Sequence, residues 1–210
     1  MKRDECICFR LVLFFFLELS ASFAGVWNVP GKADPLEMFI QAVVEQASYT
    51  KTYDPSYVKL AYPNGDVPQH TGVCSDVIIR GLRKIGFDLQ KEIHEDMKKH
   101  FSVYPKTWGL KKTDSNIDHR RVLNLMCFFT RKKWGLPISE KPSDFLPGDI
   151  VAWRLTNGLP HIGVVSSSQE VLSGNYLMVH NIGLGVQIED VLFGWKIIGH
   201  FRLPSSFLRH

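Results

Sequence analysis

The chain has 210 residues, of which 45% are hydrophobic and 22% are charged, and its formal net charge is +4. This length supports one well-buried core and hardly two, and the composition excludes a collagen-like or low-complexity chain. Basic residues are spread along the chain apart from short clusters at 98–100 and 131–133, which argues against nucleic acid as a partner.

Residues 1–24 have the three parts of a secretory signal. Basic residues precede the short apolar run 11–17, and small residues stand three positions and one position before the expected cleavage point after Ala24. We therefore expect a periplasmic or secreted protein. A membrane span requires about 20 apolar residues, so no stable membrane anchor is expected once the signal is removed.

The mature chain divides into an N-terminal arm and helix, 25–50, and one larger domain, 51–205. Asp34-Pro35 supplies an N-cap and a proline for the first helical turn, and the apolar spacing that follows predicts a helix to about Ser48. Residues 52–71 are rich in turn-forming residues, which predicts a loop with a short strand near 57–60.

A helix is predicted directly after Cys74. Ile78, Leu82 and Ile85 have the spacing of one helix face, and Gly86 suits a left-handed C-cap. Cys74 then lies at the helix N-terminus, where free backbone N–H groups and the helix dipole favour a thiolate. This position predicts a cysteine nucleophile, with the backbone N–H groups around Ser75 available to hold an oxyanion.

The remaining elements change from helix to strand along the chain. A second helix is predicted at 89–100, an irregular stretch at 104–117, a helix opened by Asp118 that ends by Gly135, and then a linker to 145. Strands are predicted at 150–153, 161–165, 176–180, 186–188 and 195–201. We therefore expect an α+β domain in which N-terminal helices pack on a C-terminal antiparallel sheet.

Two histidines mark the ends of neighbouring strands. His161 opens the strand 161–165, and His180 closes the strand 176–180. If these strands pair as a hairpin, the two imidazoles become neighbours, as a general base and the group that orients it would be. Asn181, on the other face of the strand, is the second choice for the orienting residue.

These residues resemble the NlpC-type papain-like cell-wall peptidases. The shared order is a cysteine on a helix N-terminus, Pro-Gly-Asp before a strand, and His-Ile-Gly-Val-Val followed by a polar strand end. The resemblance implies a papain-like fold with Cys74 as nucleophile, His161 as base and His180 as orienting residue. It also implies that Tyr62 lines the site, although Tyr62 is equally a packed loop aromatic.

The chain is more closely similar to a bacterial family known as domain of unknown function 1287. The matching blocks span about 53–202 and include Tyr62-Pro63-Asn64-Gly65-Asp66, Gly72-Val73-Cys74-Ser75-Asp76-Val77, Asn116-Ile117-Asp118-His119-Arg120-Arg121-Val122, His161-Ile162-Gly163-Val164-Val165, His180-Asn181-Ile182-Gly183, Glu189-Asp190 and Gly199-His200-Phe201-Arg202. Together, resemblance and expected export imply a cysteine hydrolase that cleaves a peptide or amide bond of peptidoglycan. Residues 89–135, inserted between nucleophile and base, depart from the compact peptidase layout.

Two clusters have both a functional and a structural interpretation. His119, Arg120 and Arg121 could bind a substrate carboxylate, or Asp118 could cap a helix while the arginines pair with Asp76 or Glu189. Asp76, in the first turn after the nucleophile, is expected to bind N–H groups there. Its negative charge would oppose thiolate formation.

Several alternatives remain open from the sequence. Cys74 and Cys127, the two cysteines of the mature chain, could form a disulfide in a non-catalytic module that binds cell-wall peptide or a protein partner. The same residues would also support acyl transfer, and Cys74 with the two histidines could bind zinc. The preferred interpretation needs no cofactor and no metal, and it leaves the oligomeric state open.

Overall fold

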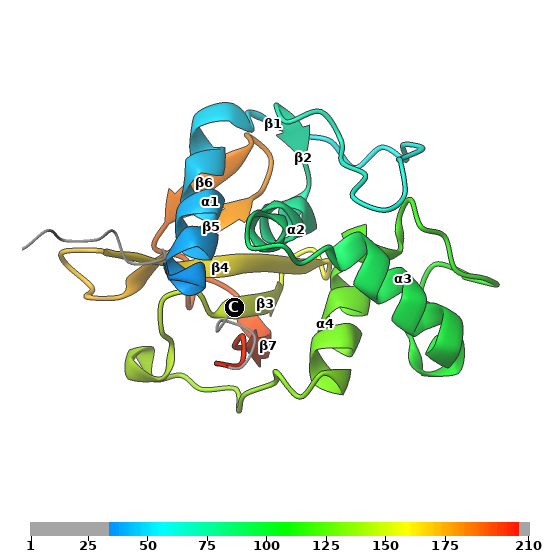
Figure 1. Cartoon of the computed structure of the whole chain (residues 1–210). Coiled ribbons are helices and arrows are strands. Elements are labelled where there is room, and N and C mark those ends of the chain that lie inside the picture. Colours follow the sequence, from blue (N-terminus) through cyan, green and yellow to red (C-terminus); the bar gives the residue numbers. More distant parts are fainter. Residues whose placement is uncertain (1–33, 206–210) are drawn as a thin grey trace, which may run out of the picture. The chain divides into compact units, whose positions relative to one another are not determined.

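The computed structural model describes residues 34–205 (Figure 1). The predicted signal 1–24 and the arm 25–33 lie outside these described residues. Within 34–205, no helix combines the length and the hydropathy that crossing a membrane requires.

Four α-helices precede the main sheet. They are α1 (Pro35–Tyr49), α2 (Cys74–Lys84), α3 (Leu89–His100) and α4 (Val122–Arg131), with 3-10 turns at 101–103, 118–120 and 142–144. The predicted helices at 35–48 and 89–100 are confirmed, and Gly86 follows α2 with φ +84° as expected for a left-handed residue.

Two local predictions are wrong. No strand forms at 57–60; instead β1 (Thr52–Tyr53) pairs in parallel with β2 (Thr71–Gly72), which brings the two ends of this long loop together. Asp118 does not cap a helix either. It lies in a 3-10 turn, and α4 begins at Val122 with Arg121 as its N-cap.

The five later strands form one antiparallel sheet. They are β3 (Ile150–Arg154), β4 (Pro160–Gln169), β5 (Tyr176–Asn181), β6 (Val186–Glu189) and β7 (Lys196–Phe201), in the spatial order β6-β5-β4-β3-β7. The predicted order of helices first and antiparallel sheet second is confirmed, so the chain has an α+β fold.

The sheet buries both of its faces. Ile162 and Val164 on β4 join the larger core, which also contains buried residues of α1, α2 and α4. Trp153 and Val165 belong to a smaller core on the opposite face, which the segments 142–145 and 191–195 cover. Because side chains alternate along a strand, His161 shares the face of Trp153 and Val165, whereas α2 covers the other face.

Helix α1 packs directly on α2 within the larger core. Phe39 and Val43 are fully buried there, and Gly81 on α2 allows the close approach. A Cβ at residue 81 would lie 2.5 Å from Val43 Cγ2. The predicted N-terminal helix is therefore part of the core that supports α2, and α2 in turn carries Cys74.

Candidate active site

Cys74 is the first residue of α2, as the sequence predicts. Val73 is the N-cap and supplies no side-chain cap, so the carboxylate of Asp76 takes that role and accepts a hydrogen bond of 2.7 Å from Val73 N. This bond occupies one of the free donors at the helix start. It also places a negative charge in the first turn, close to the sulfur.

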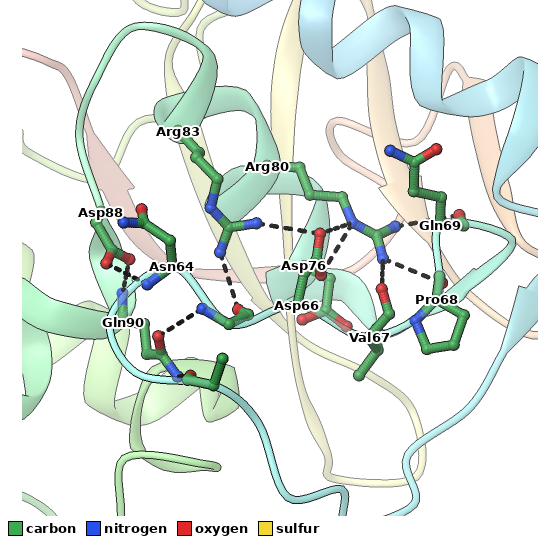
Figure 2. A network of polar contacts seen from close by, with 12 residues as sticks. Asn64, Asp66, Val67, Pro68, Gln69, Asp76, Arg80, Arg83, Asp88 and Gln90 are labelled. Atoms are coloured by element: carbon green, nitrogen blue, oxygen red, sulfur yellow. Dashed lines mark hydrogen bonds and ion pairs between the residues drawn. The ribbon is translucent and has the colours of Figure 1, made fainter.

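Arg80 and Arg83 hold the loop that leads into Cys74 (Figure 2). Arg80 Nε lies 3.0 Å from Asp66 Oδ2, and Arg80 Nη2 donates to backbone carbonyls at Val67 (3.2 Å) and Thr71 (3.0 Å). Arg83 Nη1 lies 3.1 Å from the same Asp66 oxygen. Since both arginines project from α2, this network fixes the loop to the helix that begins at Cys74.

Asn181 ties the backbone before Cys74 to the end of β5. Its side-chain Nδ2 donates to Gly72 O at 3.0 Å, and Asp54 N donates to the same carbonyl at 3.0 Å. The amide of Asn181 therefore contacts the segment that precedes Cys74, not His161. The alternative in which Asn181 orients the base is wrong for this structure.

The Cys74 sulfur lies beside the start of β4. The β4–β5 ladder begins with the pair Gly163 and His180, so β4 extends past it by several residues. Beyond that last pair, the backbone N–H of Ile162 donates to Cys74 Sγ. The sulfur is therefore adjacent to the peptide bond that joins His161 to Ile162.

The thiol of Cys74 is not the resting thiolate that its helix position predicts. Cys74 is 5% exposed, and burial raises its pKa to about 12. The N–H groups of Ile162 and Ser75 lower the pKa, but Asp76 raises it, as the sequence suggested. Desolvation is larger than the effect of the helix N-terminus, so the expectation of a preformed thiolate is wrong.

The two predicted histidines are in direct contact. His161 Nε2 lies 2.9 Å from His180 Nδ1. The residues are diagonal in the ladder rather than opposite, because His180 pairs with Gly163. A Cβ at residue 163 would lie 3.0 Å from His180 Cβ and 3.2 Å from Trp153, so the missing side chain leaves room for the His161 ring to reach across.

Glu189 extends this contact to the surface. Its Oε2 lies 3.0 Å from His180 Nε2, and its side chain is 46% exposed although His180 itself is fully buried. The sequence analysis placed Glu189 only in a matching block and as a possible partner of arginine. The strand register would have predicted the contact between Glu189 and His180. Glu189 pairs with Met178, and Met178 lies two residues before His180, on the same face of β5.

Two tryptophans, Trp153 and Trp195, pack against both imidazoles and shield them from solvent. The His161 ring is stacked on Trp153 with centroids 5.8 Å apart, and Trp195 meets it edge-on at 5.7 Å. Burial lowers the pKa of His161 to about 3, and burial also lowers the pKa of His180 although Glu189 raises it. Both rings are therefore neutral at neutral pH.

A cleft of about 310 Å³ opens beside Cys74, and Tyr53 forms part of its wall. The pKa of Tyr53 is raised to about 12, first by burial and then by Cys74 and Asp76. The sequence analysis missed this tyrosine. It reaches the site through the β1–β2 bridge, in which Tyr53 pairs with Gly72, and a contact over that sequence distance has no local signature.

Tyr62 lies elsewhere, so its predicted place beside the nucleophile is wrong. Its hydroxyl donates to Glu95 Oε1 at 2.8 Å, and its ring meets His94 edge-on at 5.3 Å. Both partners belong to α3. The alternative reading of Tyr62 as a packed loop aromatic is the one observed.

The two predicted arginines have different surroundings. Arg120 forms a buried, two-pronged ion pair with Asp76, with Nε–Oδ1 at 3.0 Å and Nη2–Oδ2 at 2.9 Å. Its own carbonyl accepts from Ser75 Oγ at 2.7 Å. Arg120 is therefore structural, as one of the two interpretations predicted.

Arg121 lines the cleft with Cys74 and stacks on Trp108 at 4.5 Å. Its Nη1 is buried without a hydrogen-bond partner among the described residues, and burial lowers its pKa. His119 is almost fully buried, its pKa is lowered to about 3 by burial, and it is not among the residues that line the cleft.

Cys74 and Cys127 are both free thiols. The disulfide considered from the sequence is therefore not formed, and Cys127 Sγ lies instead 3.6 Å from Val103 O. Across residues 34–205, no three His, Cys, Asp or Glu side chains are grouped so that they could hold a metal ion.

Comparisons with known proteins identify relatives of this chain. A protein of Escherichia coli K12 described as uncharacterized protein YijF is 58% identical over 158 residues, which cover 75% of this chain and 77% of that protein. A crystal structure from Staphylococcus aureus, described as similar to a lipoprotein of the NLP/P60 family, is 14% identical with a TM-score of 0.38.

That match covers 83% of this chain and 44% of the staphylococcal chain, and a likeness at this score says nothing about activity. The family model described as Domain of unknown function (DUF1287) matches residues 40–203, which include Cys74 and all of strands β3 to β7. The chain belongs to the DUF1287 family.

Proposed function

We propose that this protein is an exported cysteine hydrolase that cleaves a peptide or amide bond of peptidoglycan. The observation that carries the proposal is the arrangement of Cys74 beside the start of β4, where His161 is hydrogen-bonded to His180. A nucleophile, a base and an orienting group are the parts that cysteine catalysis requires.

The reaction begins from a neutral thiol, because the pKa of Cys74 is about 12. As Cys74 Sγ attacks the amide carbonyl, its proton passes to His161 Nδ1. The C–N bond then breaks, the same proton passes to the leaving amine, and a thioester remains on Cys74. His161 next takes a proton from water, which attacks the thioester and releases the carboxylic acid and the thiol.

Backbone donors at the sulfur support this sequence of steps. The N–H groups of Ser75 and Ile162 are directed at Cys74 Sγ, so they lie next to the carbon that the sulfur would attack. We assign the oxyanion to these two groups. Tyr53, not Tyr62, is the tyrosine near enough to assist, because it lines the same cleft.

Arg121 is the proposed contact for a substrate carboxylate. It lines the cleft, it stacks on Trp108, and one of its nitrogens lacks an acceptor. Peptidoglycan peptides carry free carboxylates. The choice of peptidoglycan rests on the expected export and on the resemblance to cell-wall peptidases.

The test is digestion of purified muropeptides, with products identified by mass. The mature protein should release new fragments, Cys74→Ala should release none, and Cys127→Ala should behave as the wild type because Cys127 is remote from the cleft. Identical product profiles for wild type and Cys74→Ala would refute cleavage of peptidoglycan. Adding amines or alcohols would reveal acyl transfer as a new product mass.

A non-catalytic peptide-binding module is the second candidate. The 5% exposure of Cys74 and its pKa of about 12 favour it, since a buried neutral thiol is a poor nucleophile unless a base assists. Muropeptide binding with equal affinity by wild type and Cys74→Ala, without cleavage by either, would support the module.

A further inference from the structure

We propose that Glu189 is a positioning residue that sets the tautomer of His161 through His180, and so leaves His161 Nδ1 free to accept a proton. The contacts that carry this inference are His161 Nε2–His180 Nδ1 at 2.9 Å and His180 Nε2–Glu189 Oε2 at 3.0 Å. The inference deepens the proposed function and rests on it, because the tautomer matters to catalysis only if His161 is the base.

Glu189, at the outer end of these contacts, determines where the proton of His180 lies. A carboxylate accepts hydrogen bonds and donates none, so the contact with Glu189 requires a proton on His180 Nε2. A neutral imidazole carries one N–H and one lone pair. Therefore His180 Nδ1 carries the lone pair and must be the acceptor in its contact with His161.

The same rule then fixes the inner ring. His180 Nδ1 can accept only if His161 Nε2 is the donor, so the single proton of neutral His161 is on Nε2. His161 Nδ1 is left with its lone pair, and no described residue donates a hydrogen bond to it. The reverse tautomers would place a bare His180 nitrogen against the Glu189 carboxylate, which is repulsive.

Because both imidazoles are buried, the hydrogen bonds that join His161, His180 and Glu189 determine the tautomers of the two rings. His161 and His180 are 2% and 0% exposed, and Trp153 and Trp195 cover both rings. Water therefore cannot readily replace a missing partner, and the tautomer of a buried ring depends on its hydrogen bonds. Only Glu189, at the outer end, is substantially exposed.

The test reads protonation directly, by long-range ¹H–¹⁵N correlation of histidine-labelled protein at neutral pH. Wild type should show His161 and His180 each as a single tautomer with the proton on Nε2. Glu189→Ala and the isosteric Glu189→Gln should show mixed or inverted tautomers for both rings. A purely structural contact would leave these ¹⁵N shifts unchanged.

Asp190 provides a matched control. Its carboxylate is on the adjacent residue but accepts from Ser173 Oγ (2.7 Å) and Asn175 Nδ2 (3.2 Å), so Asp190→Ala removes the same charge without touching the histidines. Asp190→Ala should keep the wild-type tautomers, and Glu189→Asp should recover part of them.

The functional readout is acylation of Cys74 by p-nitrophenyl acetate, followed as p-nitrophenolate release. It should fall about tenfold in Glu189→Ala, a typical loss when an orienting partner is removed. A wild-type proton on His161 Nδ1, or unchanged tautomers in both Glu189 variants, overturns the inference. Correct tautomers with no acylation of Cys74 would instead refute the proposed function and leave the tautomer assignment standing.

Discussion

Two buried histidines on this sheet have different hydrogen-bond partners. His200, on β7, has both nitrogens engaged: Nε2 lies 2.8 Å from Asp149 Oδ2, and Nδ1 lies 3.4 Å from Pro137 O. His161, on β4, has only Nε2 engaged by a side chain of the described part of the protein. A ring whose two nitrogens are satisfied fixes structure, whereas the free nitrogen of His161 leaves this ring available for the proposed proton transfer.

The carboxylates beside these histidines, Asp149 at His200 and Glu189 at His180, also differ in burial and in their number of partners. Asp149 is 1% exposed and also binds Arg202, with Oδ2–Nη2 at 2.6 Å, so its charge is fully matched inside the protein. Glu189 is 46% exposed, and among residues 34–205 its carboxylate binds His180 alone. Asp149 and its partners therefore stabilise the fold, whereas Glu189 and His180 have the proposed role of orienting His161.

The largest expected effect comes from removing the base. His161→Gln should reduce acylation of Cys74 about 1,000-fold, within the usual contribution of a general base, and lower the melting temperature less than His200→Gln does. His200→Gln should have the opposite profile, with a lowered melting temperature and acylation close to wild type. Similar losses of acylation in folded His161→Gln and folded His200→Gln would contradict the assignment of a catalytic role to His161 and a structural role to His200.

Breaking the structural cluster should cost stability. Asp149→Asn should lower the free energy of unfolding by about 3 kcal/mol, because it leaves the Arg202 and His200 partners of a buried carboxylate unmatched. Denaturant unfolding of wild type and variant at pH 7 measures this difference. The folded fraction should still acylate at the wild-type rate.

The effect of Asp149 also has a defined pH dependence. Hydrogen bonds from Arg202 and His200 outweigh burial and hold the pKa of Asp149 below its usual value. Its contribution is therefore fully present above the unfolded-state pKa of about 3.9 and is lost as the pH falls through the lower folded-state pKa. A gap between wild type and Asp149→Asn that does not narrow under acid would contradict this assignment.

The smallest expected effect concerns the two arginines Arg202 and Arg121. Arg202 is matched by Asp149, but Arg121 has no carboxylate partner among the described residues. Arg121→Met should reduce the ratio of Cys74 alkylation by iodoacetate to that by iodoacetamide about fivefold, as expected for losing a partly exposed charge contact. Lys91→Met, on the exposed side of α3, should leave the ratio unchanged.

Periodic patterns predicted most of the fold. The 3.6-residue spacing before and after Cys74 and the short strands after 150 correspond to the observed helices and sheet, because each pattern is local and repeats over several residues. The prediction that Asp118 opens a helix was wrong because the Asp118 carboxylate makes tertiary contacts instead of capping a helix. One of these contacts is with His94 Nδ1 at 3.1 Å.

The site was predictable only in part. The contact between His161 and His180 follows from two adjacent strands, and it was predicted for that reason. Tyr53 and Glu189 were missed because their places depend on a parallel bridge and on strand register. The neutral state of Cys74 was missed because burial cannot be read from a helix N-terminus alone.

The first residues of β4, 160–162, extend beyond the β4–β5 ladder, and this has a practical consequence. The amide hydrogen of Ile162 is directed at the Cys74 sulfur, beyond the last pair of the β4–β5 ladder, so its magnetic environment reports the chemical state of Cys74. Conversion of the thiol to a thioester replaces the S–H by an acyl group, which withdraws electron density from the sulfur and weakens its hydrogen bond with that amide. A two-dimensional spectrum of the backbone can therefore record an acyl-enzyme as it forms, with no chromophore and no knowledge of the natural substrate.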